Sequence, residues 1–388
     1  FYIRLVFISE AVDLVYRVLA RFFCPISSSC RFFKSPRYNR LFTPKMTKIG
    51  THDGTFHCDE VLAVTMLRQL PEYRDAELVR SRDPGKLNEC DILVDVGSEF
   101  DPVRHRYDHH QPSFNKTMRD LHPGLQPEVK LSSAGLVYAH FGKRVLAEVA
   151  GLKSVDAPEV AVLFRSVYST FVSEVDAIDN GVPIAPVPPT YSIHTGLSAR
   201  VAHLNPCWNR PDENETECFN KACKMVEEEF VSRVRGLADT WLPAREVVLK
   251  SLLARHSVHP CGLILRIDRP VCPWKAHFFD LEKEILGVSE EASAEARDFK
   301  GRPVFVISER NEGGEFAVTA IPRSRDDPFS LRVPLVSAWA GKRSEELSKA
   351  VGLLDCVFVH SNLFFGLHKS FDGALEMALR SLRAAGYV

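Results

Sequence analysis

The stretch Arg104-His105-Arg106-Tyr107-Asp108-His109-His110-Gln111 follows an apolar run, Ile92-Leu93-Val94-Asp95-Val96-Gly97, which is typical of a buried strand ending in an acid. A second polar cluster, His52-Asp53-Gly54-Thr55-Phe56-His57-Cys58-Asp59-Glu60, lies upstream at another predicted junction of strand and helix. Open α/β sheets bind their ligands at the carboxyl ends of their strands. Imidazoles and carboxylates are the ligands of divalent transition metals, so these stretches predict a metal site at a sheet edge.

Strands and helices alternate around these stretches. Short strands are predicted over 48–52, where the strand runs into a turn, and over 76–80 and 92–96. Helices are predicted over 59–70, 132–149 and 160–178, each with apolar residues at helical spacing. This alternation predicts an α/β protein with a doubly wound, mostly parallel sheet.

The second half of the chain begins after a proline-rich break at 183–189. A charged helical stretch over about 217–256 follows it, and then come strand-like runs at 262–267, 303–308, 316–321 and 356–360 and a closing helix over 372–384. We predict a metal-binding catalytic domain over 46–212. A helical connection and a second α/β domain, which would bind substrate, are predicted over 213–388.

Composition excludes several classes of protein. The chain has 388 residues, of which 45% are hydrophobic, and a formal net charge of −1. A nucleic-acid contact must therefore come from a local basic patch, because the whole molecule is not a polycation. The ten cysteines contain no Cys-x-x-Cys pair, which argues against a structural zinc site and favours free thiols over a disulfide framework.

Residues 1–45 differ from the rest of the chain. They are rich in arginine, serine and aromatic residues, and their only acids are Glu10 and Asp13. This composition is typical of a mitochondrial targeting segment, although an incomplete or mistranslated leader before Met46 is an equal alternative. Charges interrupt the apolar residues of 1–20, so no membrane-spanning helix is predicted there.

The clustered residues suffice for two cations. His52, His57 and Asp59 occupy one turn, while Asp95 ends a strand. Further ligands come from the adjacent histidines His109 and His110 and from Asp176, one helical turn before Asp179. Such a set can hold two divalent ions with a bridging carboxylate, for which Asp95 is the natural candidate. Mn²⁺ or Mg²⁺ suits this oxygen-rich mixture better than Zn²⁺.

Each residue also has an ordinary structural alternative. An acid at a strand end, such as Asp95, often serves as a helix N-cap, and Asp59 and Glu60 could simply favour a helix N-terminus. His52 could be a hydrogen-bonded turn residue, and Asp176 a solvated helix acid. A chance gathering of all these residues at consecutive sheet edges is much rarer than any single coincidence.

At this point the residues resemble a known family. Asp108-His109-His110 is the motif of the DHH phosphoesterase superfamily, and the chain is similar to its melanocyte-proliferating-gene exonuclease family from about residue 46 to the C-terminus. The motifs that carry the resemblance are 51–60, 94–97, 106–111, 130–136, 174–181, 197–201, 241–245, 272–275 and 358–360.

The resemblance implies a two-metal site of the manganese type. It assigns His52, His57 and Asp95 to the first ion, and to the second it assigns Asp59, Asp95, His109 and Asp176. His57 stands where superfamily relatives usually carry aspartate. The catalytic group would comprise Asp95, Asp108, His109 and His110, with His110 contacting a substrate phosphate.

Substrate-binding residues are expected in two places. By resemblance, Phe364-Phe365-Gly366-Leu367-His368-Lys369 takes the place of a glycine-rich turn whose backbone amides hold phosphate, with Gly366, His368 and Lys369 as contacts. Arg104 and Arg106 flank the motif and could neutralise phosphates, or they could equally be solvated strand residues.

The family resemblance implies a metal-dependent 3′–5′ exonuclease that takes RNA as substrate, works in mitochondria and in the nucleus or nucleolus, with the cytoplasm as a further location, and has no membrane partner. Two alternatives keep the fold. One is hydrolysis of a small phosphoanhydride or a short oligonucleotide. The other is a non-catalytic RNA-binding scaffold, against which the complete ligand set argues.

Overall fold

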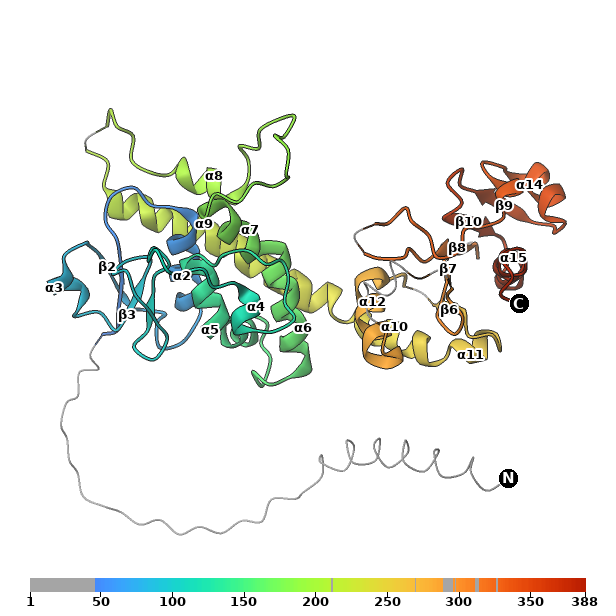
Figure 1. Cartoon of the computed structure of the whole chain (residues 1–388), viewed down its shortest axis with the longest axis horizontal. Helices are drawn as coiled ribbons and strands as arrows, with labels where there is room; N and C mark the ends of the chain where they lie inside the picture. Colours follow the sequence, from blue (N-terminus) through green and yellow to red (C-terminus); the bar gives the residue numbers. More distant parts are fainter. Residues whose placement is uncertain are drawn as a thin grey trace, which may run out of the picture. The chain divides into compact units, whose positions relative to one another are not determined.

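The structure is a computed structural model that describes residues 46–388 except 211, 269, 289–295, 297, 311–313 and 326. The leader predicted over 1–45 lies outside these residues. Two five-stranded sheets organise the described chain (Figure 1). Among the described residues, every helix is too short or too polar to cross a membrane.

The first sheet is mostly parallel. Its strands lie in the order β2-β1-β3-β5-β4, in which the first four run parallel and β4 pairs antiparallel with β5. Their bounds are β1 Lys48–Thr51, β2 Glu77–Arg80, β3 Ile92–Val94, β4 Phe100–Asp101 and β5 Arg106–Tyr107. The carboxyl ends of β1, β3 and β5 therefore meet at one edge of the sheet.

The two faces of this sheet are covered unequally. Ile92 and Val94 face the main core, which α2 (Cys58–Arg68) and α5 (Ser133–Val149) help to form. Leu93 alternates to the other face, where it joins a small cluster beside α3 (Pro84–Leu87). Gly50 also faces this cluster, and an added Cβ would lie 2.5 Å from Leu93. This close approach of β1 requires glycine.

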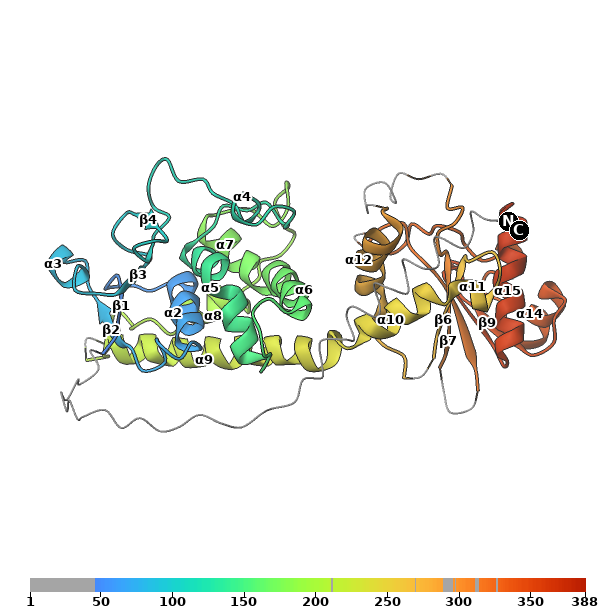
Figure 2. The ribbon, with the colours of Figure 1, turned by 90° about the horizontal axis from the view of Figure 1, so that it is seen from below.

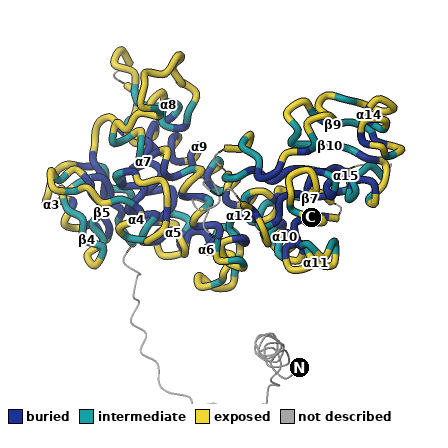
Figure 3. The backbone as a smooth tube through the Cα atoms, turned by 45° about the vertical axis from the view of Figure 1, so that its right-hand side comes forward, coloured by how far each residue is buried: buried dark blue, intermediate teal, exposed yellow. Residues whose placement is uncertain are grey.

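Further helices complete the first core. They are α4 Met118–Leu121, α6 Pro158–Val167, α7 Ser173–Asp179, α8 Leu197–Ala202 and α9 Glu215–Gly236. π-Helical turns follow α6 and α9, over Tyr168–Val172 and Leu237–Trp241. The segments on either side of α8 are mostly exposed (Figure 3).

The second sheet has the order β6-β7-β8-β10-β9, and only β6 and β7 are parallel. Its strands are β6 Ile264–Ile267, β7 Phe305–Glu309, β8 Phe316–Ala320, β9 Cys356–Val359 and β10 Phe365–His368. The accompanying helices are α10 Ala244–Leu253, α11 Arg255–Val258, α12 Trp274–Leu286, α14 Ser344–Val351 and α15 Phe371–Ala384, with a 3₁₀ turn at Ser337–Trp339. Figure 2 shows α10 and α12 on one side of β6 and β7, and α15 on the other.

The predicted α/β class is confirmed, with two mixed sheets. Most long segments match the sequence-based boundaries, and the helix predicted over 160–178 becomes α6, a π-helical turn and α7. The strand β4 and the helices α12 and α14 were not predicted as elements, and β5 was expected only as an extended segment before His109, without bounds. β4 and β5 have two residues each and exist through pairing with neighbouring strands, which no local pattern reveals.

Candidate metal centre

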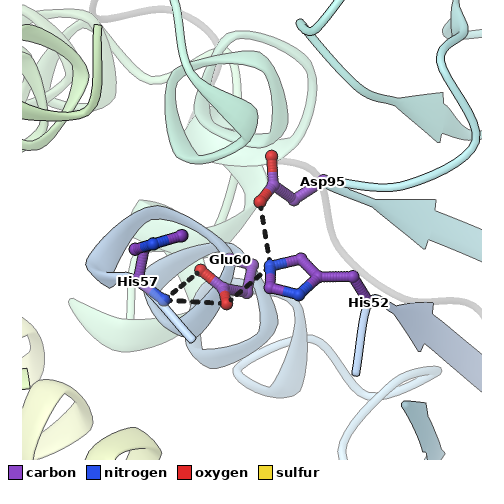
Figure 4. Close-up of side chains that lie close together, drawn as sticks. All are labelled: His52, His57, Glu60 and Asp95. Carbon is purple, nitrogen blue, oxygen red and sulfur yellow. Dashed lines mark hydrogen bonds and ion pairs between the residues drawn. The ribbon is translucent and has the colours of Figure 1, made fainter. Parts of the chain in front are cut away.

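His52 begins the centre, directly after β1. Its Nδ1 lies 2.9 Å from the carbonyl oxygen of Asp53, which can only accept, and 3.3 Å from Arg82 Nη2, which can only donate; the shorter contact favours a hydrogen on Nδ1. The lone pair is then on Nε2, which lies 3.1 Å from Glu60 Oε1 and 3.3 Å from Asp95 Oδ2 (Figure 4). A backbone carbonyl that fixes the tautomer in this way is the usual second partner of a metal-binding imidazole.

Glu60 is held by the start of α2. His57 is the residue before the helix, and its N–H donates to both carboxylate oxygens of Glu60, at 2.9 and 3.0 Å. Potential ligand atoms of His52, His57, Glu60 and Asp95 lie within 4.8 Å of one another, which makes them the first candidate cation group. His57 is exposed, whereas the other three members are buried.

Asp95 connects this group to the next. Its backbone has a φ of 57°, in the left-handed region, and its N–H donates to the carbonyl of Tyr107 on β5. One carboxylate oxygen faces His52, while the other, Oδ1, lies 3.3 Å from His109 Nε2. The strained backbone thus aims the carboxylate between two imidazoles.

The residues of the DHH motif divide into two roles. His109 and His110 each join a ligand group, namely Asp95-His109-His110 and Asp59-His109-Asp179. Asp108 belongs to none of the groups found in the described chain. Its buried carboxylate accepts from the amides of Ser98 and His110, at 2.6 and 3.1 Å, and lies 2.8 Å from His110 Nδ1. Asp108 therefore positions His110.

Asp176 lies apart from the ligand groups found in the described chain. Its Oδ1 accepts from the Ser132 amide at 3.0 Å, the Ser132 hydroxyl at 2.7 Å and the Gly135 amide at 3.0 Å. Gly135 permits this contact, because an added Cβ would lie 2.4 Å from both carboxylate oxygens. Oδ2 of Asp176 is buried and makes no hydrogen bond. Asp179, one turn later, supplies the carboxylate that faces His109, at 3.2 Å.

Two residues of the groups, Glu60 and Asp179, were absent from the ligands predicted by sequence. Glu60 carried a signal, since it is the third residue of a helix that directly follows a predicted ligand, His57. Asp179 carried a weaker one, as the second acid of a pair spaced by one turn.

The buried acids of the centre resist being ionised together. Burial, reinforced by the charge of Asp95, raises the pKa of Asp59. Burial raises the pKa of Glu60 to about 8 and, with help from the Asp59 charge, that of Asp179 to about 8. Although burial opposes it, the neighbouring imidazoles of His109 and His52 hold the pKa of Asp95 below its ordinary range. A divalent cation among these groups would relieve the repulsion.

Buried polar atoms of the centre also indicate that it could hold a divalent cation. Asp59 Oδ1 is buried and has no hydrogen-bond partner, and the buried Asp95 Oδ1 and His109 Nε2 lie 3.3 Å apart without forming a well-aligned hydrogen bond. Buried polar atoms without partners are costly, so a group of them that faces a common point favours a ligand. Oxygen and imidazole donors together fit Mn²⁺ or Mg²⁺.

The raised pKa values predict how ions change stability with pH. Without ions, the folded chain retains protons on Glu60 and Asp179 that the unfolded chain releases near pH 4.5. The free energy of unfolding should therefore fall as the pH rises from about 4.5 to about 8. Bound cations would replace those protons. We expect Mn²⁺ to raise the Tm more at about pH 8 than at about pH 6, measured against a chelator at equal ionic strength. Equal shifts at both pH values would contradict this assignment.

The arginines beside the motif are already engaged. Arg104 pairs with Glu99 and with Asp101, whose carboxylate lies 2.7 Å from its Nε. The guanidinium of Arg106 donates to backbone carbonyls, including those of Arg104 at 2.9 Å and Cys90 at 3.4 Å. A substrate phosphate would have to displace these partners.

The predicted contacts on β10 occupy three different environments. Gly366 is packed, since an added Cβ would lie 3.1 Å from Leu335 and 3.3 Å from Met377. His368 is buried, and its Nε2 lies 2.7 Å from the carbonyl of Leu354 while its Nδ1 accepts from the Ser370 amide at 3.0 Å. Lys369 is exposed and lies 3.3 Å from Asp355. Both ring nitrogens of His368 thus serve the fold.

The fold and the centre together define a class: an α/β protein with overlapping imidazole and carboxylate groups at a sheet edge, suited to divalent cations. The family model MYG1_exonuc, described as "Uncharacterised protein family (UPF0160)", matches residues 48–382. The chain therefore belongs to the MYG1 exonuclease family.

Individual relatives agree over nearly the whole chain. The chain is 44% identical over 354 residues to "MYG1 exonuclease" of Homo sapiens, covering 91% of this chain and 90% of that protein. It is 45% identical over 350 residues to "MYG1 exonuclease" of Bos taurus, covering 90% and 87%. With "MYG1 protein YER156C" of Saccharomyces cerevisiae (strain ATCC 204508 / S288c) it shares 35% identity over 348 residues, covering 87% and 96%.

Proposed function

We propose that this chain is a metal-dependent phosphodiesterase that shortens RNA from its 3′ end and releases nucleoside monophosphates. The observation that carries the proposal is the placement of Asp95, whose two oxygens face His52 and His109 in separate ligand groups. A carboxylate so placed can bridge two cations. Relatives named exonuclease support a nuclease over other metal-dependent classes.

The ligands of the two ions follow from the groups. The first ion would be held by the group His52, His57, Glu60 and Asp95. The second would lie between the two groups that share His109, with Asp59, Asp95 and Asp179 as its carboxylate ligands. When bound, such ions polarise a phosphoryl oxygen and activate water near neutral pH. We favour Mn²⁺, with Mg²⁺ as the alternative, because the ligands are mostly oxygen.

The protein side chains orient this chemistry. Asp108 fixes the ring of His110, whose side chain is 60% exposed beside Asp95. His110 can therefore present Nε2 to a substrate phosphate while Nδ1 stays on Asp108. The Asp53 carbonyl holds His52 in its ligand tautomer.

Other parts of the proposal concern the whole protein. We assign the first sheet to a catalytic domain of DHH type over 46–212, and the second sheet, with its helical connection, to a substrate-binding domain over 213–388. The arginine-rich and serine-rich composition of 1–45 supports a mitochondrial address, and its basic cluster is also compatible with a nuclear or nucleolar one.

The direct test is to incubate the chain with single-stranded RNA labelled at its 3′ or its 5′ end, in Mn²⁺, Mg²⁺ or chelator. We expect a metal-dependent ladder of 5′-labelled products and early release of the 3′ label as mononucleotide. Shortening from the 5′ end would refute the proposed 3′-to-5′ direction of degradation. Cleavage of pyrophosphate or dinucleotides alone would support the small-substrate alternative. Inactivity on every substrate, despite bound metal, would support the alternative of a non-catalytic RNA-binding scaffold.

A further inference from the structure

An unbroken row of aromatic rings crosses β9, β10 and the turn between them. We name Phe358, His360, Phe364 and Phe365 the aromatic strip. Centroids of successive rings lie 6.2, 4.6 and 6.2 Å apart. All four residues are only partly buried. Such distances lie within the range of ring–ring contacts, so the strip forms one continuous surface.

The two phenylalanines of the strip that lie within strands, Phe358 and Phe365, face away from α15. On β10, Gly366 and His368 are buried, and an added Cβ on Gly366 would approach Met377 of α15. Phe365 and Leu367 alternate to the opposite face. Phe358 lies directly across from Leu367 in the β9–β10 pairing, which places it on the same face.

No hydrophobic core of the described chain includes these phenylalanines. The cluster under α15 contains Val359 and Met377, and the cluster of α10 and α12 contains Leu265 and Val306, from the other end of the sheet. Phe358, Phe364 and Phe365 belong to neither cluster. An apolar surface that packs into no core is more often a binding surface than a part of the fold.

Two arginines give the strip a positive charge. The guanidinium of Arg343 lies 4.3 Å from the ring centroid of Phe358, and that of Arg310 lies 5.3 Å from the centroid of Phe365. Both side chains belong to exposed residues, and neither forms an ion pair with a described carboxylate. They are therefore available to an anionic ligand at the two ends of the row.

We propose that the aromatic strip binds single-stranded RNA, with bases stacked on the phenylalanine rings and Arg343 and Arg310 neutralising adjacent phosphates. A sheet face with exposed aromatic rings and flanking cations is the chemistry by which proteins hold unpaired bases. A duplex presents no free base faces and would bind less well. This inference rests on the proposed function for the nature of the nucleic acid, and it moves the substrate contacts of the second sheet from Gly366 and His368 to the opposite face.

The test measures binding without catalysis. The full chain is titrated into a fluorescent single-stranded oligoribonucleotide in the presence of chelator, and a gel verifies that the oligonucleotide stays intact. Phe358→Leu and Phe365→Leu keep an apolar side chain but remove the ring. We expect each to raise the Kd by about tenfold, because stacking contributes about 1–3 kcal/mol per base.

Matched variants separate binding from folding. Phe329→Leu, at an exposed phenylalanine outside the strip, and Lys349→Gln, at an exposed cation of α14, should leave the Kd unchanged. Arg343→Gln and Arg310→Gln should each weaken binding and flatten its dependence on salt. Thermal melts of every variant identify any loss of fold.

The outcomes distinguish this inference from the proposed function. If folded variants of the aromatic strip bind RNA with unchanged affinity, the proposed RNA-binding role of the strip is wrong, even if the wild type degrades RNA. Equal affinity for duplex and single strand, or no RNA binding by the wild type, would overturn it as well. RNA binding that depends on the strip, in a chain that does not degrade RNA with Mn²⁺, would support the RNA-binding role of the strip and refute the proposed exonuclease activity.

Discussion

Asp95→Asn is expected to lower kcat for RNA hydrolysis by about 10³-fold or more, the largest effect of any single substitution in the chain. Asparagine preserves the shape of the side chain but removes its charge and one acceptor oxygen. Its amide group would then point at either His52 or His109, each of which lies 3.3 Å from a carboxylate oxygen of Asp95. Each proposed ion loses a ligand at once, because Asp95 belongs to two of the three ligand groups, the one with His52 and the one with His109 and His110.

The measurement is single-turnover degradation of labelled RNA, together with the number of Mn²⁺ ions bound per chain. We expect fewer bound ions and a folded protein. Asp75→Asn is the matched control, because Asp75 is an exposed acid of the same sheet domain outside every ligand group. Normal activity of Asp95→Asn would refute the bridging role and, with it, the two-ion arrangement.

Sequence patterns were sufficient for the parts of the fold that rest on local periodicity. The apolar run of β3 and the apolar stripe of α5 are each sufficient to predict an element. Helix α12 also carried a readable signal, since a proline precedes it and apolar residues recur at Trp274, Phe278 and Leu281. The two-residue strand β4 carried none, because it is defined by its pairing with β5.

The candidate metal centre was likewise only partly predictable from the sequence. The carboxyl ends of parallel strands share an edge, and this rule alone brings His52, Asp95 and His109 together. The rule does not predict the direction of a side chain on a helix. Asp108 shows the limit most clearly: the motif places it among catalytic residues, whereas its carboxylate accepts hydrogen bonds from Ser98 and His110. Only the three-dimensional contacts separate a ligand from the residue that orients it.

Helix α7 offers a direct choice between the sequence-based ligand, Asp176, and the one that the geometry favours, Asp179. Asp179→Asn should weaken Mn²⁺ binding by about 10²-fold, since even residues that merely orient ligands cost about 10–100-fold. Asp176→Asn should leave Mn²⁺ binding nearly unchanged. Its retained Oδ1 can still accept from Ser132 and Gly135, and burial already raises the pKa of this carboxyl to about 7.

Asp176→Ala completes the comparison, because it leaves three buried donors of Ser132 and Gly135 without an acceptor. Unsatisfied buried donors cost about 1–3 kcal/mol each, so this variant should lose stability, seen as a lower Tm with or without metal. Mn²⁺ titration of the two asparagine variants distinguishes the roles of the two acids. If Asp176→Asn loses affinity as strongly as Asp179→Asn, its buried Oδ2 is a ligand and the second ion has the set that the family resemblance implied. If only Asp179→Asn loses affinity for Mn²⁺, Asp176 serves to hold the start of α5 beside the metal centre. Its place in the family motif then reflects folding rather than metal coordination.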